Sequence, residues 1–341
     1  MRLLNAKTLK VEEFFGHQIP PYTILSHTWD KDEVSFGDMQ SSNFKNKKGF
    51  AKIWYACNQT REDGWEYTWI DTCCIDKTSS AELSEAINSM FQWYRDAQVC
   101  YAYLADVLEG SGHYGAEIPD APLEKSRWFT RGWTLQELIA PREVIFYGTE
   151  WRPLGRKHEM ATELHGITGI DQFVLKIRDG RLLERALEET CAARKMSWAS
   201  KRETTRPEDI AYCLLGLFGI NMPLLYGEGM KAFTRLQQEI ARVSNDQTLL
   251  AWGFPAEPGK KSRNDATTGP RVFAHDPSYF ASAGTVVRHD INGDSFRPWT
   301  LTNLGIGLEV AVLRDNWPAT CVAILSCHYE DDMRGPIGLR L

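Results

Sequence analysis

The sequence predicts an α/β fold: a mostly parallel sheet with flanking helices, followed by a helical region and a small antiparallel β unit. Short apolar runs alternate with helical patterns in the first half of the 341 residues, helical patterns dominate from about residue 151, and β-branched alternation returns near the end. We therefore expect an α/β domain over 1–150, a helical region over 151–250 and a β-rich unit over 251–341.

The first half supplies the strands of the sheet. Four apolar runs have the length of strands that are buried on both faces: 22–29, 66–74, 99–107 and 143–148. Helical patterns lie between them at 47–60, 81–96 and 127–140. The second of these is the clearest, because Ser79 or Ser80 can cap it and its apolar residues recur at helical spacing. Strands that alternate with helices predict a doubly wound, mostly parallel sheet.

The second half of the chain contains helical patterns first and strand patterns after them. Helices are expected over 156–168, 181–198, 206–219 and 228–244. Residues 255–270 are rich in Pro, Gly and charge, which predicts an exposed loop or linker. The runs at 282–291, 297–313 and 319–332 alternate as antiparallel strands do. A further strand pattern starts at 335–341 and stops, so we expect this β unit to be truncated from a longer polypeptide.

The composition restricts the partners and the location. Hydrophobic residues at 43% and charged residues at 25% are typical of a folded globular protein. The formal net charge of −6 disfavours nucleic acid as a partner. There is neither an apolar run of about 20 residues nor a secretory signal pattern, so we expect a cytoplasmic protein without a membrane span. The eight scattered cysteines are expected to be reduced and buried.

Polar side chains gather where the first two strands end. Ligands of an open parallel sheet bind beyond the carboxyl ends of its strands. We therefore expect a ligand site built from these residues: Ser26, His27, Trp29, Asp30 and Asp71.

Two other chemistries would use the same strand ends. His27 with Cys73 could act as base and thiol nucleophile, although no local signature joins them. Asp30, Asp71 and Asp76 lack the dense oxygen spacing of a calcium loop, so no metal site is expected.

The segment "SRWFTRGWTLQELIAP" (126–141) contains one carboxylate, Glu137. In a single helix, Phe129, Trp133 and Glu137 share one stripe, beside a face formed by Leu135, Leu138 and Ile139 that should be buried. A carboxylate beside an indole and partly out of water tends to hold its proton, which suits a base at neutral pH. The alternative is that Glu137 pairs with an arginine or a backbone N–H and only fixes the helix.

Several segments together resemble a known family. "YTILSHTW" (22–29), "YTWIDTCCIDK" (67–77) and "SRWFTRGWTLQELIAPREVIFYG" (126–148) resemble, in order and spacing, the heterokaryon incompatibility (HET) domain of filamentous fungi, and the resemblance extends over roughly residues 20–255. It implies an effector of programmed cell death in fungal innate immunity. That family is in turn distantly similar to Toll/interleukin-1 receptor (TIR) domains, which implies a flavodoxin-like or TIR-like sheet.

The resemblance also implies an activity. Enzymatic TIR domains cleave the nicotinamide–ribose bond of NAD with a glutamate in a "WCLxEL" segment, and "WTLQEL" (133–138) places Glu137 on that glutamate. NAD(P) is then the candidate substrate, with no cofactor required, and Glu137 is the catalytic residue of an NAD(P)+ glycohydrolase (NADase).

The roles implied for the other candidates follow from the same resemblance. Trp29 and Trp133 would stack on a ring of the substrate, while Ser26, His27 and Arg131 would reach phosphate or ribose, with Asp30 and Asp71 beside them. Self-association and an upstream sensor protein are the implied partners. Two alternatives stay open: a non-enzymatic oligomerisation module that recruits partners in death signalling, and an enzyme that acts on another nucleotide.

Overall fold

The computed structural model describes residues 1–41, 43–107, 122–254, 272–289, 299–302, 305–314, 321–330 and 335–340. The chain divides into two compact units, Met1–Leu183 and Glu184–Leu341. Each unit has its own core of fully buried aromatic side chains, which include Trp69 and Phe146 in the first and Phe233 and Phe280 in the second.

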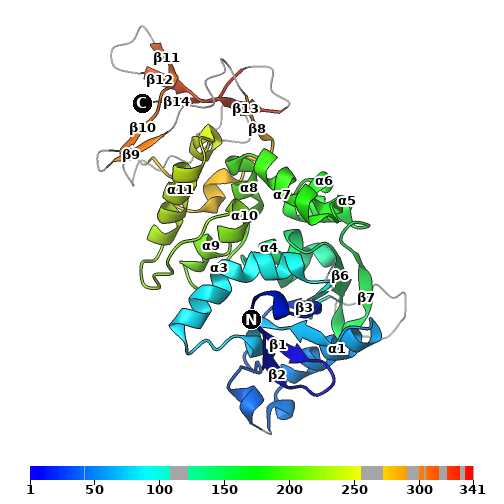
Figure 1. Ribbon diagram of the computed structural model, residues 1–341. Coiled ribbons are helices and arrows are strands. Elements are labelled where there is room, and N and C mark those ends of the chain that lie inside the picture. Colours follow the sequence, from blue (N-terminus) through cyan, green and yellow to red (C-terminus); the bar gives the residue numbers. More distant parts are fainter. Residues whose placement is uncertain are drawn as a thin grey trace. The chain divides into compact units, whose positions relative to one another are not determined.

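The first unit is built on a sheet that has seven strands within the described residues (Figure 1). The strands are β1 (Arg2–Asn5), β2 (Val11–Glu13), β3 (Tyr22–His27), β4 (Tyr67–Trp69), β5 (Cys100–Tyr103), β6 (Val144–Tyr147) and β7 (Pro153–Arg156). The α-helices are α1 (Phe50–Glu62), α2 (Asp71–Cys74), α3 (Ser80–Asp96), α4 (Thr134–Ile139), α5 (Ala161–Thr168) and α6 (Gln172–Lys176). Short 3₁₀ helices include η4 (Leu123–Lys125) and η5 (Arg127–Thr130).

The strand order of this sheet is β2-β1-β4-β3-β5-β6-β7. Strands β4, β3, β5 and β6 pair in parallel, and the outer pairs β2–β1, β1–β4 and β6–β7 are antiparallel. Numbered along the chain, the four parallel strands lie in the order 2-1-3-4, which is the flavodoxin-like arrangement. The predicted α/β class with a central parallel sheet and flanking helices is confirmed. The chain direction across the sheet reverses between β3 and β5, which makes their carboxyl ends the topological switch point.

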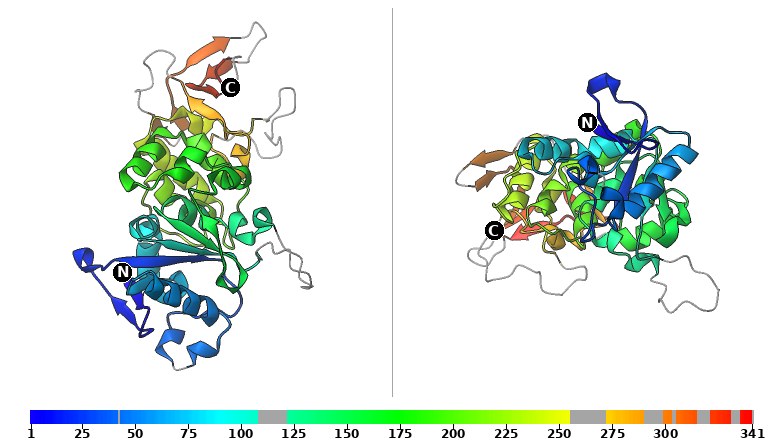
Figure 2. Two further views of the ribbon diagram at one scale, coloured as in Figure 1. Left: turned by 90° about the vertical axis from the view of Figure 1, so that its right-hand side faces the viewer. Right: turned by 90° about the horizontal axis from the view of Figure 1, so that it is seen from below.

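Helices cover both faces of the central strand β3, whose six residues are all buried. On one face, the Thr23 hydroxyl contacts that of Thr60 on α1 at 2.7 Å. On the other, the Tyr22 hydroxyl donates to the carbonyl of Trp93 on α3 at 2.7 Å. Figure 2 (left) shows the blue helix α1 and the cyan helix α3 on opposite sides of the sheet. Successive strand residues alternate between these two faces.

The helix at Ser80–Asp96 forms as the sequence predicts. The Ser79 side chain accepts a hydrogen bond from the backbone N–H of Glu82, which caps the helix start. Ala86, Ile87 and Met90 are among its buried residues and face the sheet side of the helix.

The strand predicted over 66–74 is wrong beyond its middle. β4 ends at Trp69, and Asp71–Cys74 forms the single turn α2. The backbone N–H of Cys74 donates to the carbonyl of Ile70 at 2.8 Å, so this carbonyl closes a helical turn. Asp71 therefore lies at the start of a turn at the carboxyl end of β4.

The single helix predicted over 127–140 is also wrong. Arg131 has extended backbone angles (φ −77°, ψ 136°) and separates η5 from α4. The Thr134 hydroxyl lies 2.5 Å from the carbonyl oxygen of Trp128 and 2.9 Å from that of Arg131, which stabilises the break. Phe129 consequently does not continue the helical stripe of Glu137. All six residues of α4 are buried, including Leu135, Leu138 and Ile139 as predicted.

The second unit contains helices followed by small antiparallel sheets. Its helices are α8 (Ala192–Ala199), α9 (Asp209–Tyr212), α10 (Leu215–Phe218) and α11 (Lys231–Val243), and α7 (Gly180–Glu189) crosses the boundary between the units. Its strands are β8 (Val286–Arg288), β9 (Thr300–Thr302), β10 (Gly305–Gly307), β11 (Ala311–Arg314), β12 (Cys321–Ile324), β13 (Cys327–Tyr329) and β14 (Gly338–Arg340). They pair as β8–β13, β9–β10 and β11–β12–β14, all antiparallel, which confirms the predicted β part.

Several boundaries in this half differ from the prediction. Residues 156–168 begin with the end of β7, and the helices predicted over 181–198 and 206–219 each divide into two. Strands β1 and β2 and helix α6 were not predicted. The predicted linker 255–270 lies outside the described residues.

Candidate functional site

Glu137 lies buried at the carboxyl end of β3, and only 7% of its surface is exposed. The Ser26 hydroxyl donates a hydrogen bond to Glu137 Oε2 at 2.5 Å, and the indole Nε1–H of Trp128 donates to Ser26 Oγ at 2.8 Å. Ser26 and Trp128 are themselves fully buried. The three residues come from β3, η5 and α4, so the tertiary fold brings them together.

The direction of these hydrogen bonds follows from the donors. An indole N–H can only donate, so it occupies a lone pair of Ser26 Oγ and leaves the serine proton for Glu137. Hydrogen bonds donated to a carboxylate favour its ionised form. The relay from Trp128 through Ser26 therefore stabilises a negative charge on Glu137.

Tyr94 on α3 borders the same carboxylate. Its hydroxyl lies 3.3 Å from the carbonyl of Leu25. Burial raises the pKa of Tyr94 well above its usual value, and the negative charges of Glu137 and Asp71 raise it further. Tyr94 thus stays a neutral phenol near both carboxylates. We call Ser26, Tyr94, Trp128 and Glu137 the Glu137 cluster.

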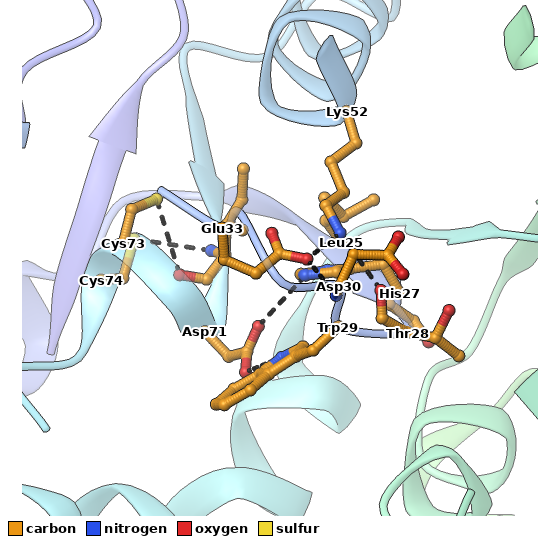
Figure 3. Close-up of polar contacts among 12 residues, drawn as sticks. Leu25, His27, Thr28, Trp29, Asp30, Glu33, Lys52, Asp71, Cys73 and Cys74 are labelled. Atoms are coloured by element: carbon orange, nitrogen blue, oxygen red, sulfur yellow. Dashed lines mark hydrogen bonds and ion pairs between the residues drawn. The ribbon is translucent and has the colours of Figure 1, made fainter. Parts of the chain in front are cut away.

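A second group of residues meets at Asp71, which begins α2 (Figure 3). The indole Nε1–H of Trp29 donates to Asp71 Oδ2 at 2.9 Å, and His27 Nε2 lies 3.8 Å from Asp71 Oδ1. Lys77 Nζ lies 3.7 Å from Asp71 Oδ2 and 3.3 Å from the centroid of the Trp29 ring. We call His27, Trp29, Asp71 and Lys77 the His27 cluster.

The His27 ring is a neutral imidazole. Burial lowers its pKa well below the usual value, and the positive charges of Lys52 and Lys77 lower it further. Neither ring nitrogen has a hydrogen-bond partner among the described residues, although only 1% of the side chain is exposed. A buried polar group without a partner is costly, and such groups often mark a bound water or ligand.

Lys52 on α1 contacts both Glu33 and the backbone that follows β3. Its Nζ lies 2.5 Å from Glu33 Oε1 and 3.1 Å from the carbonyl of Thr28, contacts that Figure 3 shows above the His27 ring. Glu33 also accepts a hydrogen bond from the backbone N–H of Asp30 at 2.7 Å. Lys52 therefore fixes the loop that follows β3.

The remaining predicted site residues are less buried than Ser26 and Glu137: Asp30, Arg131 and Trp133. The Asp30 side chain is 61% exposed and lies 3.6 Å from Arg127 Nη2. Arg131 follows η5 and Trp133 precedes α4, and both are half-buried. Of the two tryptophans predicted to stack on a ligand, Trp29 is the more exposed, at 46%.

Five of the predicted site residues thus fall into two neighbouring groups, and Asp30, Arg131 and Trp133 belong to neither. Ser26 contacts Glu137 on the face of β3 that carries α4, whereas the next residue, His27, points toward α1 and α2. Both groups lie at the carboxyl edge of the sheet, the edge at which ligands bind in sheets of this order.

Trp128, Tyr94 and Lys77 are the residues that sequence reasoning missed. Trp128 lies in the same segment as Glu137. In one continuous helix, however, Trp133 and not Trp128 would share a stripe with Glu137. Two local signals of a broken helix were available: Ser126, which caps η5, and Gly132, which lies between η5 and α4.

Two kinds of feature are absent from the described part of the chain. Across these residues, no three His, Cys, Asp or Glu side chains are grouped so that they could hold a metal ion. No described helix combines the length and the apolar character that a membrane span requires.

Comparison with known proteins gives a consistent family. Residues 22–121 match the model of the family described as "Heterokaryon incompatibility protein (HET)". The chain is 44% identical over 229 residues to the "Vegetative incompatibility protein HET-E-1" of Podospora anserina. This match covers 66% of the chain but 16% of that relative, so the chain spans a small part of the longer protein. No solved structure matches the chain.

The matched residues include the central strands β3, β4 and β5 and the helices α2 and α3, and with them Ser26, His27 and Asp71. The chain is therefore a protein of the heterokaryon incompatibility (HET) domain family.

Proposed function

We propose that this chain is a heterokaryon incompatibility effector of programmed cell death that hydrolyses NAD(P) at the nicotinamide–ribose bond. In this proposal the protein acts in the cytoplasm, in a self-associated state, and Glu137 is the catalytic carboxylate. The incompatibility role is supported by the family match and by the description of the Podospora relative. The distant resemblance of "WTLQEL" to the TIR segment supports the choice of reaction and substrate.

One observation carries the catalytic assignment: Glu137 is a buried carboxylate that receives a hydrogen bond from Ser26, which Trp128 orients. A carboxylate held this way needs no reorganisation when positive charge develops beside it. Its position at the carboxyl end of β3 is where ligands bind in sheets of this order.

The reaction needs few groups. Nicotinamide departs with the electron pair of its bond to C1′, and the ribose ring becomes an oxocarbenium ion that the Glu137 carboxylate stabilises. Water then adds to C1′ and releases a proton, which yields ADP-ribose or its phosphorylated form.

Glu137→Gln tests the proposal, because this substitution keeps the size of the side chain and removes its charge. Purified protein incubated with NAD should release nicotinamide, and the variant should lose about 100-fold or more of this rate, as expected when a charge-stabilising group is removed. The measurement is chromatographic detection of nicotinamide and ADP-ribose.

Glu159→Gln is the matched control, since the Glu159 side chain is 59% exposed and lies on another segment. The control should retain full activity. Thermal unfolding of both variants verifies that they fold. If Glu137→Gln retains turnover, the catalytic role of Glu137 is excluded. If the folded wild type releases no nicotinamide and Glu137→Gln still kills cells, a non-enzymatic signalling module becomes the better explanation.

A further inference from the structure

Trp29 and Asp71 together hold a positive charge in this structure. Lys77 Nζ lies 3.3 Å from the centroid of the Trp29 ring and 3.7 Å from Asp71 Oδ2. The Trp29 indole N–H donates to the same carboxylate oxygen at 2.9 Å, which fixes the ring beside the charge. A tryptophan face is the strongest aromatic partner for a cation, and the adjacent carboxylate adds to the attraction.

Lys77 holds this position with 33% of its side chain still exposed to solvent. Burial lowers its pKa, while the charge of Asp71 opposes that shift. The Trp29 ring remains 46% exposed with Lys77 in place. A lysine on a flexible four-carbon stem can leave such a position and regain its hydration in water.

His27 does not compete for the same charge. Its imidazole is neutral and its two ring nitrogens have no hydrogen-bond partner within the described ranges, although Nε2 is 3.8 Å from Asp71. The Trp29–Asp71 pair therefore offers a cation position whose internal occupant is Lys77, next to an unpartnered buried polar ring.

We propose that Trp29 and Asp71 form a binding site for a planar, cationic heteroaromatic ring, and that Lys77 is an internal competitor that such a ring displaces. The proposed function suggests the natural ligand, since the oxidised nicotinamide ring is an N-substituted pyridinium cation. A flat cation gains stacking on Trp29 as well as the attraction to Asp71, whereas the ammonium of Lys77 gains only charge contacts. The reduced, uncharged dihydropyridine ring lacks this attraction and is discriminated against.

The test uses 1-methylnicotinamide, a cation without a ribose bond, so binding is measured whether or not NAD is cleaved. Calorimetric titration of the full chain should show that Lys77→Met binds this probe about tenfold more tightly than wild type. Without the lysine, a larger fraction of the molecules has the Trp29–Asp71 position open to the probe. Asp71→Asn should weaken binding by about tenfold, since it keeps an acceptor for Trp29 but removes the charge. Uncharged nicotinamide should not bind measurably to wild type or to Lys77→Met.

Two control variants separate the site from general effects. Lys77→Arg keeps the competing cation and should show no gain in affinity. Lys45→Met removes a lysine that lies 6.0 Å from the ring centroid of Phe44 and should leave affinity unchanged. Thermal unfolding identifies any variant that is not folded.

The outcomes are distinct. Equal affinity of wild type and Lys77→Met for the cation, or undiminished binding by Asp71→Asn, would overturn the inference. Equal binding of charged and uncharged probes would overturn it as well. Binding in the stated order without any NAD turnover would support the cation site while the proposed hydrolysis fails.

Discussion

At the scale of single residues, two neighbours on β3 contribute to different clusters. Ser26 and His27 are adjacent in the chain, but the alternation of a strand sends their side chains to opposite faces of the sheet. Ser26 donates to Glu137, while His27 lies beside Asp71 and Lys52. One strand end thus contributes to both the Glu137 cluster and the His27 cluster.

Ser26→Ala should keep the Glu137 carboxylate but remove the hydrogen bond that Ser26 donates to it. The variant loses the donor to the carboxylate and leaves the Trp128 indole N–H without its acceptor, so we expect about 1–3 kcal/mol of lost stability. A less stabilised carboxylate takes up its proton more readily, so the acid limb of the rate profile should move to higher pH. Nicotinamide release measured against pH, together with urea unfolding, checks both effects.

Thr23→Val is the matched control for this change. Thr23 lies on the same strand and its buried hydroxyl contacts Thr60 on the α1 face, at 2.7 Å. This variant should lose stability to a similar extent but keep the wild-type pH profile. An identical shift of the acid limb in both variants would show that Ser26 acts only through stability.

At the scale of elements, helix α4 is short and is held at both ends. Thr134 contacts the carbonyls of Trp128 and Arg131 at its start. Beyond its end, the ammonium of the buried Lys157 donates to the carbonyl of Pro141 at 2.5 Å and lies 3.4 Å from that of Ile139. These contacts hold Glu137 in place although six residues make too short a helix to persist alone.

Lys157→Met should change how stability depends on pH. Burial lowers the pKa of Lys157 to about 8 in the folded protein, below the value near 10.5 of an unfolded lysine. Between these two values the unfolded chain binds more protons, so this residue makes stability rise with pH, by on the order of 3 kcal/mol. The contribution is complete above the unfolded value and is lost as the pH falls through about 8.

Urea unfolding from pH 7 to pH 11 measures this difference. The variant should lack the part of the rise that belongs to Lys157, while other titrating groups contribute equally to both proteins. Lys176→Met serves as a control for charge removal at the end of another helix, α6. A slope that is the same in wild type and Lys157→Met would contradict the role of burial.

At the scale of the whole molecule, the parallel core order 2-1-3-4 brings both clusters to one edge of the first unit. The ends of β3 and β4 carry Ser26, His27 and Asp71, and α4 brings Glu137 to the same edge. The second unit has its own helical core and small antiparallel sheets.

The proposed self-association predicts that activity depends on protein concentration. Nicotinamide release per molecule should rise by about tenfold when the protein concentration is raised from below to above the dissociation constant of self-association, as mass action requires. Chromatographic assays at several concentrations, with light scattering on the same samples, measure both quantities. Glu137→Gln at each concentration supplies the background. A constant rate per molecule across a measured association would contradict the need for self-association.

Local patterns predicted much of the sheet and little of the site. The strand at Tyr22–His27 and the capped helix Ser80–Asp96 were recognisable because their signals lie within a few residues. The end of β4 and the break before α4 were missed although the contacts that mark them are local, because apolar runs and helical spacing do not show the turn closed by the Ile70 carbonyl or the hydrogen bond of the Thr134 hydroxyl. Trp128 reaches Ser26 across 102 residues, a separation that no periodicity can anticipate.

The sequence by itself determined the α/β class and the family resemblance, since alternating apolar runs and helical patterns are properties of short segments. Only the tertiary structure decided that Ser26 and Trp128 support Glu137 and that Lys77 covers Trp29. These contacts join residues on different elements, so they depend on the strand order and on the face of the sheet toward which each side chain points.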